Sequence, residues 1–156
     1  MRLAVLRFGV LAVVLVAGAV FMAVQGHASA RTVVHSCGLT DRQFISNYAV
    51  ELESVGMYGN DYVHGSADAD DLIAAAREAA RSVRSSAPFD PSLQTVKRFG
   101  PVMFLDYANA VQAREDGKPA RREMVLAFTI GERVQTVLRE AQPALTAAGC
   151  DVSDLL

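Results

Sequence analysis

The sequence predicts an all-α protein, a four- or five-helix bundle closed by a disulfide between its ends. Apolar residues recur at helical spacing along most of the chain after residue 38, and the alternation typical of strands is hard to find. Cys37 precedes the first predicted helix and Cys150 follows the last one. Because the chain holds 2 cysteines, an oxidising compartment leaves them one intramolecular pairing, with free thiols or an intermolecular link as the alternative.

The first 30 residues have the pattern of a secretory signal peptide. Arg2 and Arg7 give a positive start, and the run from Phe8 to Val24 carries no charge. Ala28-Ser29-Ala30 then forms a small-x-small cleavage site. We therefore expect a single helical domain over residues 31–156 and a secreted or cell-envelope location. The alternative is a chain anchored in the membrane by an uncleaved N-terminal helix.

The charge of the chain argues against nucleic acid as a partner. Its 15 Lys and Arg residues and 17 Asp and Glu residues give a net charge of −2, and loss of Arg2 and Arg7 with the leader changes this to −4. A mildly acidic domain lacks the basic surface that neutralises phosphates.

The first predicted helix begins at Thr40, where the hydroxyl of an N-cap and Gln43 three residues later form a capping box. Its apolar face is a run at helical spacing, Phe44, Tyr48, Leu52 and Val55. We expect Gly56 and Gly59 to end this helix.

The second predicted helix runs over residues 68–86, with three aspartates in its first turn. Its outer face carries a stripe of three arginines, Arg77, Arg81 and Arg84. Asp90-Pro91 opens the third helix as cap and first residue, and Gly100-Pro101 predicts a kink or a break inside it.

The last predicted helix begins at Pro119 and ends at Gly149, beside Cys150. Pro143 is expected to kink its final turns. A disulfide from Cys37 to Cys150 would then tie the outer ends of the bundle together.

Signatures of enzymes are absent from the sequence, which contains no G-x-S-x-G, no H-E-x-x-H and no glycine-rich phosphate loop. The mature chain holds His35 and His64 as its histidines, and neither stands beside a marked nucleophile. Asp106 interrupts an apolar run; if it is buried it needs a partner, for which we expect an arginine of the last helix. We therefore expect a binding protein rather than an enzyme.

The stretch SVGMYGNDYVHG, residues 54–65, is the strongest candidate binding segment. Its glycines allow a close approach of the backbone, and Tyr58 and Tyr62 offer flat apolar rings with a polar tip. A tyrosine phenolate is an axial ligand of ferric haem in some proteins, so Tyr62 is the candidate metal ligand. His64 could hydrogen-bond this phenolate or ligate the iron itself. The alternative is an inter-helix turn whose tyrosines cap the core.

These residues resemble the small secreted haemophore-like, haem-binding proteins of mycobacteria and their relatives. The similarity lies in the leader, the all-helical domain with one cysteine near each end, and Gly59-Asn-Asp-Tyr62 followed by His64. It continues in Gln142-Pro143-Ala-Leu145 and Gly149-Cys150. The chain departs from that family in the longer spacing between its cysteines, and in having no histidine after His64.

The resemblance implies an exported, non-enzymatic protein that holds ferric haem through Tyr62, assisted by His64. Tyr58 is a further candidate cofactor-binding residue because its ring lies in the same segment. Another small apolar ligand would suit the same segment. The alternative is a structural or interaction protein of the cell envelope that carries no cofactor and binds a protein partner.

Overall fold

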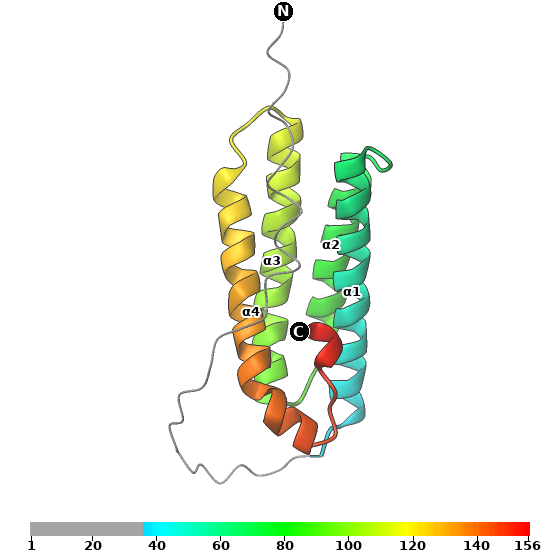
Figure 1. Ribbon diagram of the computed structural model, residues 1–156, viewed down its shortest axis with the longest axis vertical. Coiled ribbons are helices and arrows are strands. Elements are labelled where there is room, and N and C mark those ends of the chain that lie inside the picture. The colour runs from blue at the N-terminus through cyan, green and yellow to red at the C-terminus, as the bar shows by residue number, and fades with distance from the viewer. Residues whose placement is uncertain (1–35) are drawn as a thin grey trace, which may run out of the picture. The chain divides into compact units, whose positions relative to one another are not determined.

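Residues 36–156 are described by the computed structural model (Figure 1), which confirms the all-α prediction and contains no strand in this part of the chain. The elements follow in the order α1 (Leu39–His64), α2 (Ala69–Ser85), α3 (Pro91–Glu115), α4 (Arg121–Ala147) and the short 3-10 helix η1 (Ser153–Leu155). The predicted signal peptide, residues 1–30, lies outside the described residues.

The helices pack in sequence order rather than as a closed ring. α2 packs against both α1 and α3, and α3 packs along α4. Within the described part of the chain α1 and α4 do not contact each other, and η1 lies between them (Figure 1). As a result α4 has α3 as its one long helical neighbour, which leaves much of its surface uncovered.

α1 meets α3 at a few close points, of which Tyr48 makes the tightest. Its ring is fully buried between Phe44, at 5.8 Å between ring centroids, and Phe104, at 6.0 Å. A methyl group at Gly100 would come within 2.9 Å of Tyr48 Cε2. Gly100 of α3 therefore leaves the space that the ring of Tyr48 of α1 occupies.

α3 runs through Pro101 as one continuous helix, so the predicted break is wrong. A proline ring normally clashes with the Cβ of the residue before it and drives that residue out of the helical region. Gly100 has no Cβ, so this clash is absent. Two costs remain: position 101 has no N–H to donate to the Lys97 carbonyl, and the proline ring crowds that same carbonyl.

The predicted start of α1 is also wrong. The helix begins at Leu39, and Gly38, whose backbone is extended, occupies the cap position, so Thr40 already lies within the helix. The buried carboxylate of Asp41 bonds outside α1: its Oδ1 accepts from the backbone N–H of Phe89 at 2.6 Å and of Asp90 at 3.0 Å. This contact fastens the start of α1 to the segment that leads into α3.

The predicted starts of α2 and α3 are confirmed, whereas the predicted start of α4 is two residues too early. α2 begins after Asp68 as expected. Asp90 caps α3 by accepting from Ser92 N at 2.8 Å and Leu93 N at 3.2 Å. α4 begins at Arg121, two residues later than Pro119, and continues through Pro143 to Ala147; Gly149 then takes a positive φ of 87°.

The predicted disulfide is confirmed. Cys37 and Cys150 are bonded, with their Cα atoms 5.2 Å apart across a sequence separation of 113. The backbone N–H of Cys37 also donates to the Ala148 carbonyl at 2.8 Å, and Val152 and Leu155 of the C-terminal segment are buried beside it. The two ends of the described chain are thus joined covalently, by a hydrogen bond and by apolar packing.

Candidate functional site

The candidate binding segment, residues 54–65, belongs to the last turns of α1 and is not a loop. Gly56 and Gly59 lie inside the helix, so the prediction that they end it is wrong. The helix ends at His64, and Gly65 provides the left-handed cap with φ 75°. Ser66 N then donates to the Asp61 carbonyl at 2.8 Å, which closes the turn.

Gly59 serves packing between helices. A methyl group at this position would lie 3.1 Å from the hydroxyl oxygen of Tyr107, which reaches across from α3. α1 and α3 therefore exchange two similar contacts, Tyr107 over Gly59 and Tyr48 over Gly100. The sequence predicted that a ligand could approach the backbone at Gly59. The Tyr107 side chain of the protein itself occupies that space.

Tyr62 is half-buried and already has a partner. Its hydroxyl donates to Glu115 Oε1 of α3 at 2.6 Å, and the guanidinium carbon of Arg114 lies 5.9 Å from the centre of its ring. Burial, followed by the hydrogen bond to Glu115, raises the pKa of Tyr62 above its usual value. Both effects favour the neutral phenol and oppose the phenolate that would bind ferric iron.

His64 does not join Tyr62. Two residues apart on an α-helix, the side chains leave the axis in directions about 200° apart. His64 is exposed, and its Nδ1 lies 2.7 Å from the Asn60 carbonyl one turn back in the same helix. The structure thus brings Tyr62 to α3 and leaves His64 on another side of α1.

Tyr58 lies one turn before Tyr62, on a neighbouring part of the same helix face. Both rings are partly buried and pack against the hydrophobic core. This arrangement agrees with the alternative interpretation in which the tyrosines cover the core. Among the described residues, no group of three or more His, Cys, Asp or Glu side chains is placed to hold a metal ion. Because Tyr62 and His64 lie on different sides of α1, these two residues do not fit a pair of ligands to one haem iron.

Asp106 has a different partner from the predicted one. In the described part of the chain it forms no ion pair with an arginine of α4. Instead, burial and the neighbouring carboxylate of Glu123 raise the pKa of Asp106. Glu123 Oε2 is itself buried without a hydrogen-bond partner. The carboxylates of Asp106 on α3 and Glu123 on α4 thus lie near enough to repel each other, which spacing along one helix could not reveal.

The predicted arginine stripe is exposed on α2. Arg81 bonds Glu78 one turn earlier, through Nε at 3.0 Å and through a second nitrogen. Arg77 and Arg84 are exposed on the same helix. A solvated, partly self-paired stripe of this kind does not define a ligand site.

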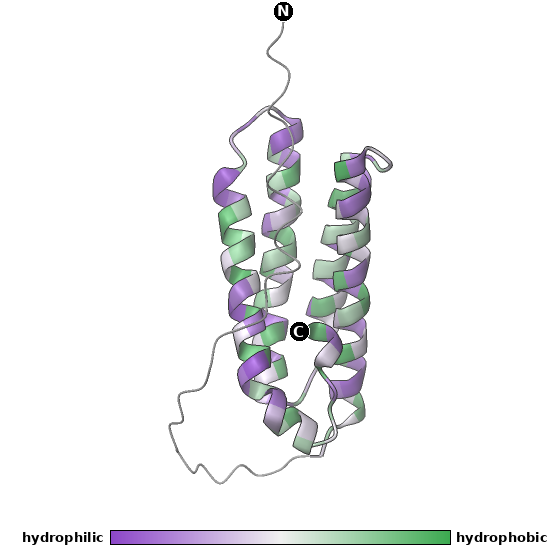
Figure 2. Cartoon of the chain, viewed as in Figure 1, coloured by the Kyte–Doolittle hydropathy of each residue, from purple (hydrophilic) through white to green (hydrophobic). Residues whose placement is uncertain are grey.

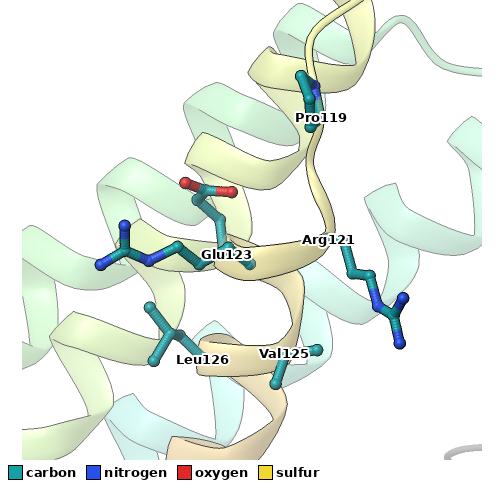
Figure 3. A pocket seen from close by; sticks show the side chains of 6 residues that line it. Pro119, Arg121, Glu123, Val125 and Leu126 are labelled. Atoms are coloured by element: carbon teal, nitrogen blue, oxygen red, sulfur yellow. The ribbon is translucent and has the colours of Figure 1, made fainter.

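Within residues 36–156, exposed apolar side chains lie close together in the sequence on the N-terminal half of α4. Three large apolar side chains are exposed within four positions: Val125 at 54%, Leu126 at 42% and Phe128 at 40%. An open depression of about 700 Å³ lies beside two of them, Val125 and Leu126, and is lined also by Pro119, Arg121, Arg122 and Glu123. Figure 3 shows Arg121 and Val125 leaving α4 on one side and Leu126 on another. We call Arg121, Arg122, Val125, Leu126, Phe128 and Glu132 the α4 surface.

The sequence contains a signal for this surface. The residues from Met124 to Phe128 read MVLAF, which leaves the predicted helix without a polar side at this point. Such a segment must be covered on several sides or be exposed. α3 covers one side, at Ala127, and the described residues leave the others open.

Comparison of the chain with known protein families, with characterised proteins and with solved structures gave no match. No helix in the described range 36–156 is long and apolar enough to cross a membrane. The function must therefore be argued from the residues and their arrangement.

Proposed function

We propose that the protein is an exported, non-enzymatic interaction protein that binds its partner through the α4 surface. The observation that carries this proposal is the pair of exposed apolar side chains Val125 and Phe128, one turn apart on one face of α4, with exposed Leu126 on the adjacent face. In the described part of the chain this helix packs along one other long helix. Isolated exposed apolar residues are normal, whereas contiguous ones with a polar rim mark sites of association. Arg121, Arg122 and Glu132 supply that rim.

Export is supported by the disulfide and by the composition of the first 30 residues. A disulfide between Cys37 and Cys150 persists in an oxidising compartment and is rare in the reducing cytosol. Mass spectrometry of the protein from the cells that make it should find Arg31 as the first residue. An intact Met1 would instead support the uncleaved N-terminal anchor.

The interaction role is tested by photocrosslinking in the producing cells. A photoreactive amino acid replaces Val125 in one variant and Leu126 in another. The matched control carries it at Val50, which is exposed to 59% on the outer side of α1. We expect an adduct of defined mass from positions 125 and 126 and none from position 50. Equal labelling at all three positions, or at none, would remove the α4 surface as a binding site.

Haem binding through Tyr62 alone is a second candidate function. It is supported by the position of the Tyr62 hydroxyl, half-exposed at the end of α1, with the cation of Arg114 beside its ring. When bound, haem would supply its iron as the redox or ligand-binding centre. The chain would have to release the Tyr62 hydroxyl from Glu115 and stabilise the phenolate.

A haemin titration followed by absorbance separates this candidate from the first. Tyr62→Phe should abolish a saturable spectral shift, whereas His64→Ala should leave it unchanged because His64 points elsewhere. Burial is the main cause of the raised pKa of Tyr62, and Glu115 adds to it. Glu115→Gln should therefore strengthen binding to a smaller degree, because it removes the negative charge beside the phenol. If wild type and Tyr62→Phe titrate identically, Tyr62 is not a haem ligand.

A further inference from the structure

We infer that the partner of the α4 surface is a second copy of this chain, with the two α4 helices docked antiparallel. The inference rests on the proposed interaction role and names its partner. Four residues carry it, Arg121, Val125, Phe128 and Glu132, which we call the α4 seam.

The spacing of the α4 seam is that of a helix that packs along another helix. Its residues follow at intervals of four, three and four positions, which keeps them in one narrow line, as in the contact line of a coiled coil. All four residues are exposed. Figure 2 shows the same order on α4, with a hydrophobic segment between two hydrophilic ones.

The α4 seam is complementary to itself in one orientation. With two copies antiparallel, Val125 of one faces Phe128 of the other, and Arg121 of one faces Glu132 of the other. A twofold axis makes each of these contacts occur twice, as in an isologous dimer. The parallel orientation would place arginine against arginine and glutamate against glutamate, so the end charges select the antiparallel one.

The charges at the two ends of the α4 seam are available for this pairing. Within the described residues neither the Arg121 guanidinium nor the Glu132 carboxylate forms an ion pair or a hydrogen bond. Nearby Arg133, by contrast, lies over the Phe99 ring at 4.4 Å to its centre. An unpaired cation and an unpaired anion at opposite ends of an apolar segment fit a second copy better than a partner of one charge sign.

The uncovered part of α4 also has a defined end. Gln135 Nε2 donates to the Leu155 carbonyl at 3.0 Å, so the C-terminal segment begins to cover α4 less than one turn after Glu132. The contact is therefore confined to about three turns of helix. An interface this short is smaller than that of a stable obligate dimer, so we expect a weak, concentration-dependent one.

Sedimentation equilibrium of the full protein from its producing cells tests the inference, with its mass followed over a wide range of concentration. Wild type should move from one chain mass to twice that mass. Arg121→Glu or Glu132→Arg alone should weaken the dimer by about tenfold, because each converts two attractive contacts into two repulsive ones. The double variant Arg121→Glu with Glu132→Arg should restore it.

Glu140→Arg is the matched control, since it makes the same charge change at an exposed position of α4 outside the α4 seam. It should leave the dimer unchanged. A single mass at every concentration would overturn the inference, as would a double variant no better than the single ones. If the adducts from positions 125 and 126 contain a different protein, the interaction role stands and the second copy is excluded. If they link to the first 35 residues of the same chain, an internal segment covers α4 and the dimer is likewise excluded.

Discussion

Glycines inside a helix lower its stability unless something uses the space where their side chains would be. Gly56 and Gly100 illustrate the two cases. Nothing lies within 4 Å of the place of a Cβ at Gly56, whereas the ring of Tyr48 lies 2.9 Å from that place at Gly100. The same residue type is therefore replaceable in α1 and required in α3.

Gly56→Ala should raise the free energy of unfolding by about 0.5–1 kcal/mol, because alanine favours the helix and meets no neighbour. Gly100→Ala should lower it by about 1–3 kcal/mol, since the buried Tyr48 ring must move and the new Cβ also meets the ring of Pro101. Urea unfolding of both variants measures the difference. A gain in stability from Gly100→Ala would show that the α1–α3 contact is looser than described.

The carboxyl pair between α3 and α4 makes stability depend on pH. The folded pKa of Asp106 lies above its usual 3.8. A raised folded pKa means that the contribution of Asp106 is fully present below pH 3.8 and is lost as the pH rises through the folded value.

Asp106→Asn should therefore stabilise the protein at neutral pH, by less than about 1 kcal/mol for a partly solvated group, and lose this advantage in acid. Thermal unfolding of wild type and variant over a series of pH values checks it. Glu123→Gln should give part of the same gain, and the two changes together should add less than their sum. A gain that stays constant down to the lowest pH would rule out repulsion between the two carboxylates.

Among the elements, existence and type were predictable from the sequence, while several ends were not. The apolar spacing of α1 is a property of the helix itself, and Asp90-Pro91 is a local start signal that the structure confirms. Gly59 and Gly100 resemble helix breakers in the sequence, but each lies opposite a tyrosine of another helix. The tyrosine contacts that offset the low helix propensity of these glycines come from packing between segments distant in the sequence. Local sequence patterns do not predict such contacts.

The contact of α1 with the start of α3 depends on Asp41. Its carboxylate accepts two backbone N–H groups, from Phe89 and Asp90, and is buried. Asp41→Ala should lower the free energy of unfolding by about 1–3 kcal/mol, because two part-buried backbone N–H groups lose their acceptor. Asp41→Asn keeps an acceptor oxygen and should lose less. Chemical unfolding of the two variants compares them, and equal losses would argue that the charge rather than the hydrogen bonds matters.

For the whole molecule, the bond between Cys37 and Cys150 constrains the unfolded chain over a separation of 113 residues. Replacing both cysteines with serine should lower the free energy of unfolding by about 2–5 kcal/mol. Melting with and without a reducing agent provides the measurement, and the serine variant, which reductant cannot change, is its control. Identical melting of oxidised and reduced wild type would show that packing alone holds the ends together.

The fold was more predictable than the site at this scale. Two cysteines that flank a helical region can form one intramolecular disulfide. The structure contains this predicted bond and the predicted helices. The site hypothesis placed Tyr62 and His64 together because they are close in sequence, and α1 separates them because it continues as a helix through both. The α4 surface exists because one side of α4 lacks a neighbour among the described residues. Which side is left open is decided by tertiary packing and not by local sequence.

The sequence separation between the two cysteines also sets an order of events in biosynthesis. Cys37 leaves the ribosome 113 residues before Cys150, a delay of roughly 6–23 s at ordinary rates of translation. During that interval the Cys37 thiol has no cysteine to pair with. All four long helices are synthesised before Cys150. Covalent closure is thus a late step that a prematurely terminated chain can never complete. Such a product would keep a reactive sulfhydryl at Cys37, a chemical mark by which a cell could recognise an unfinished molecule.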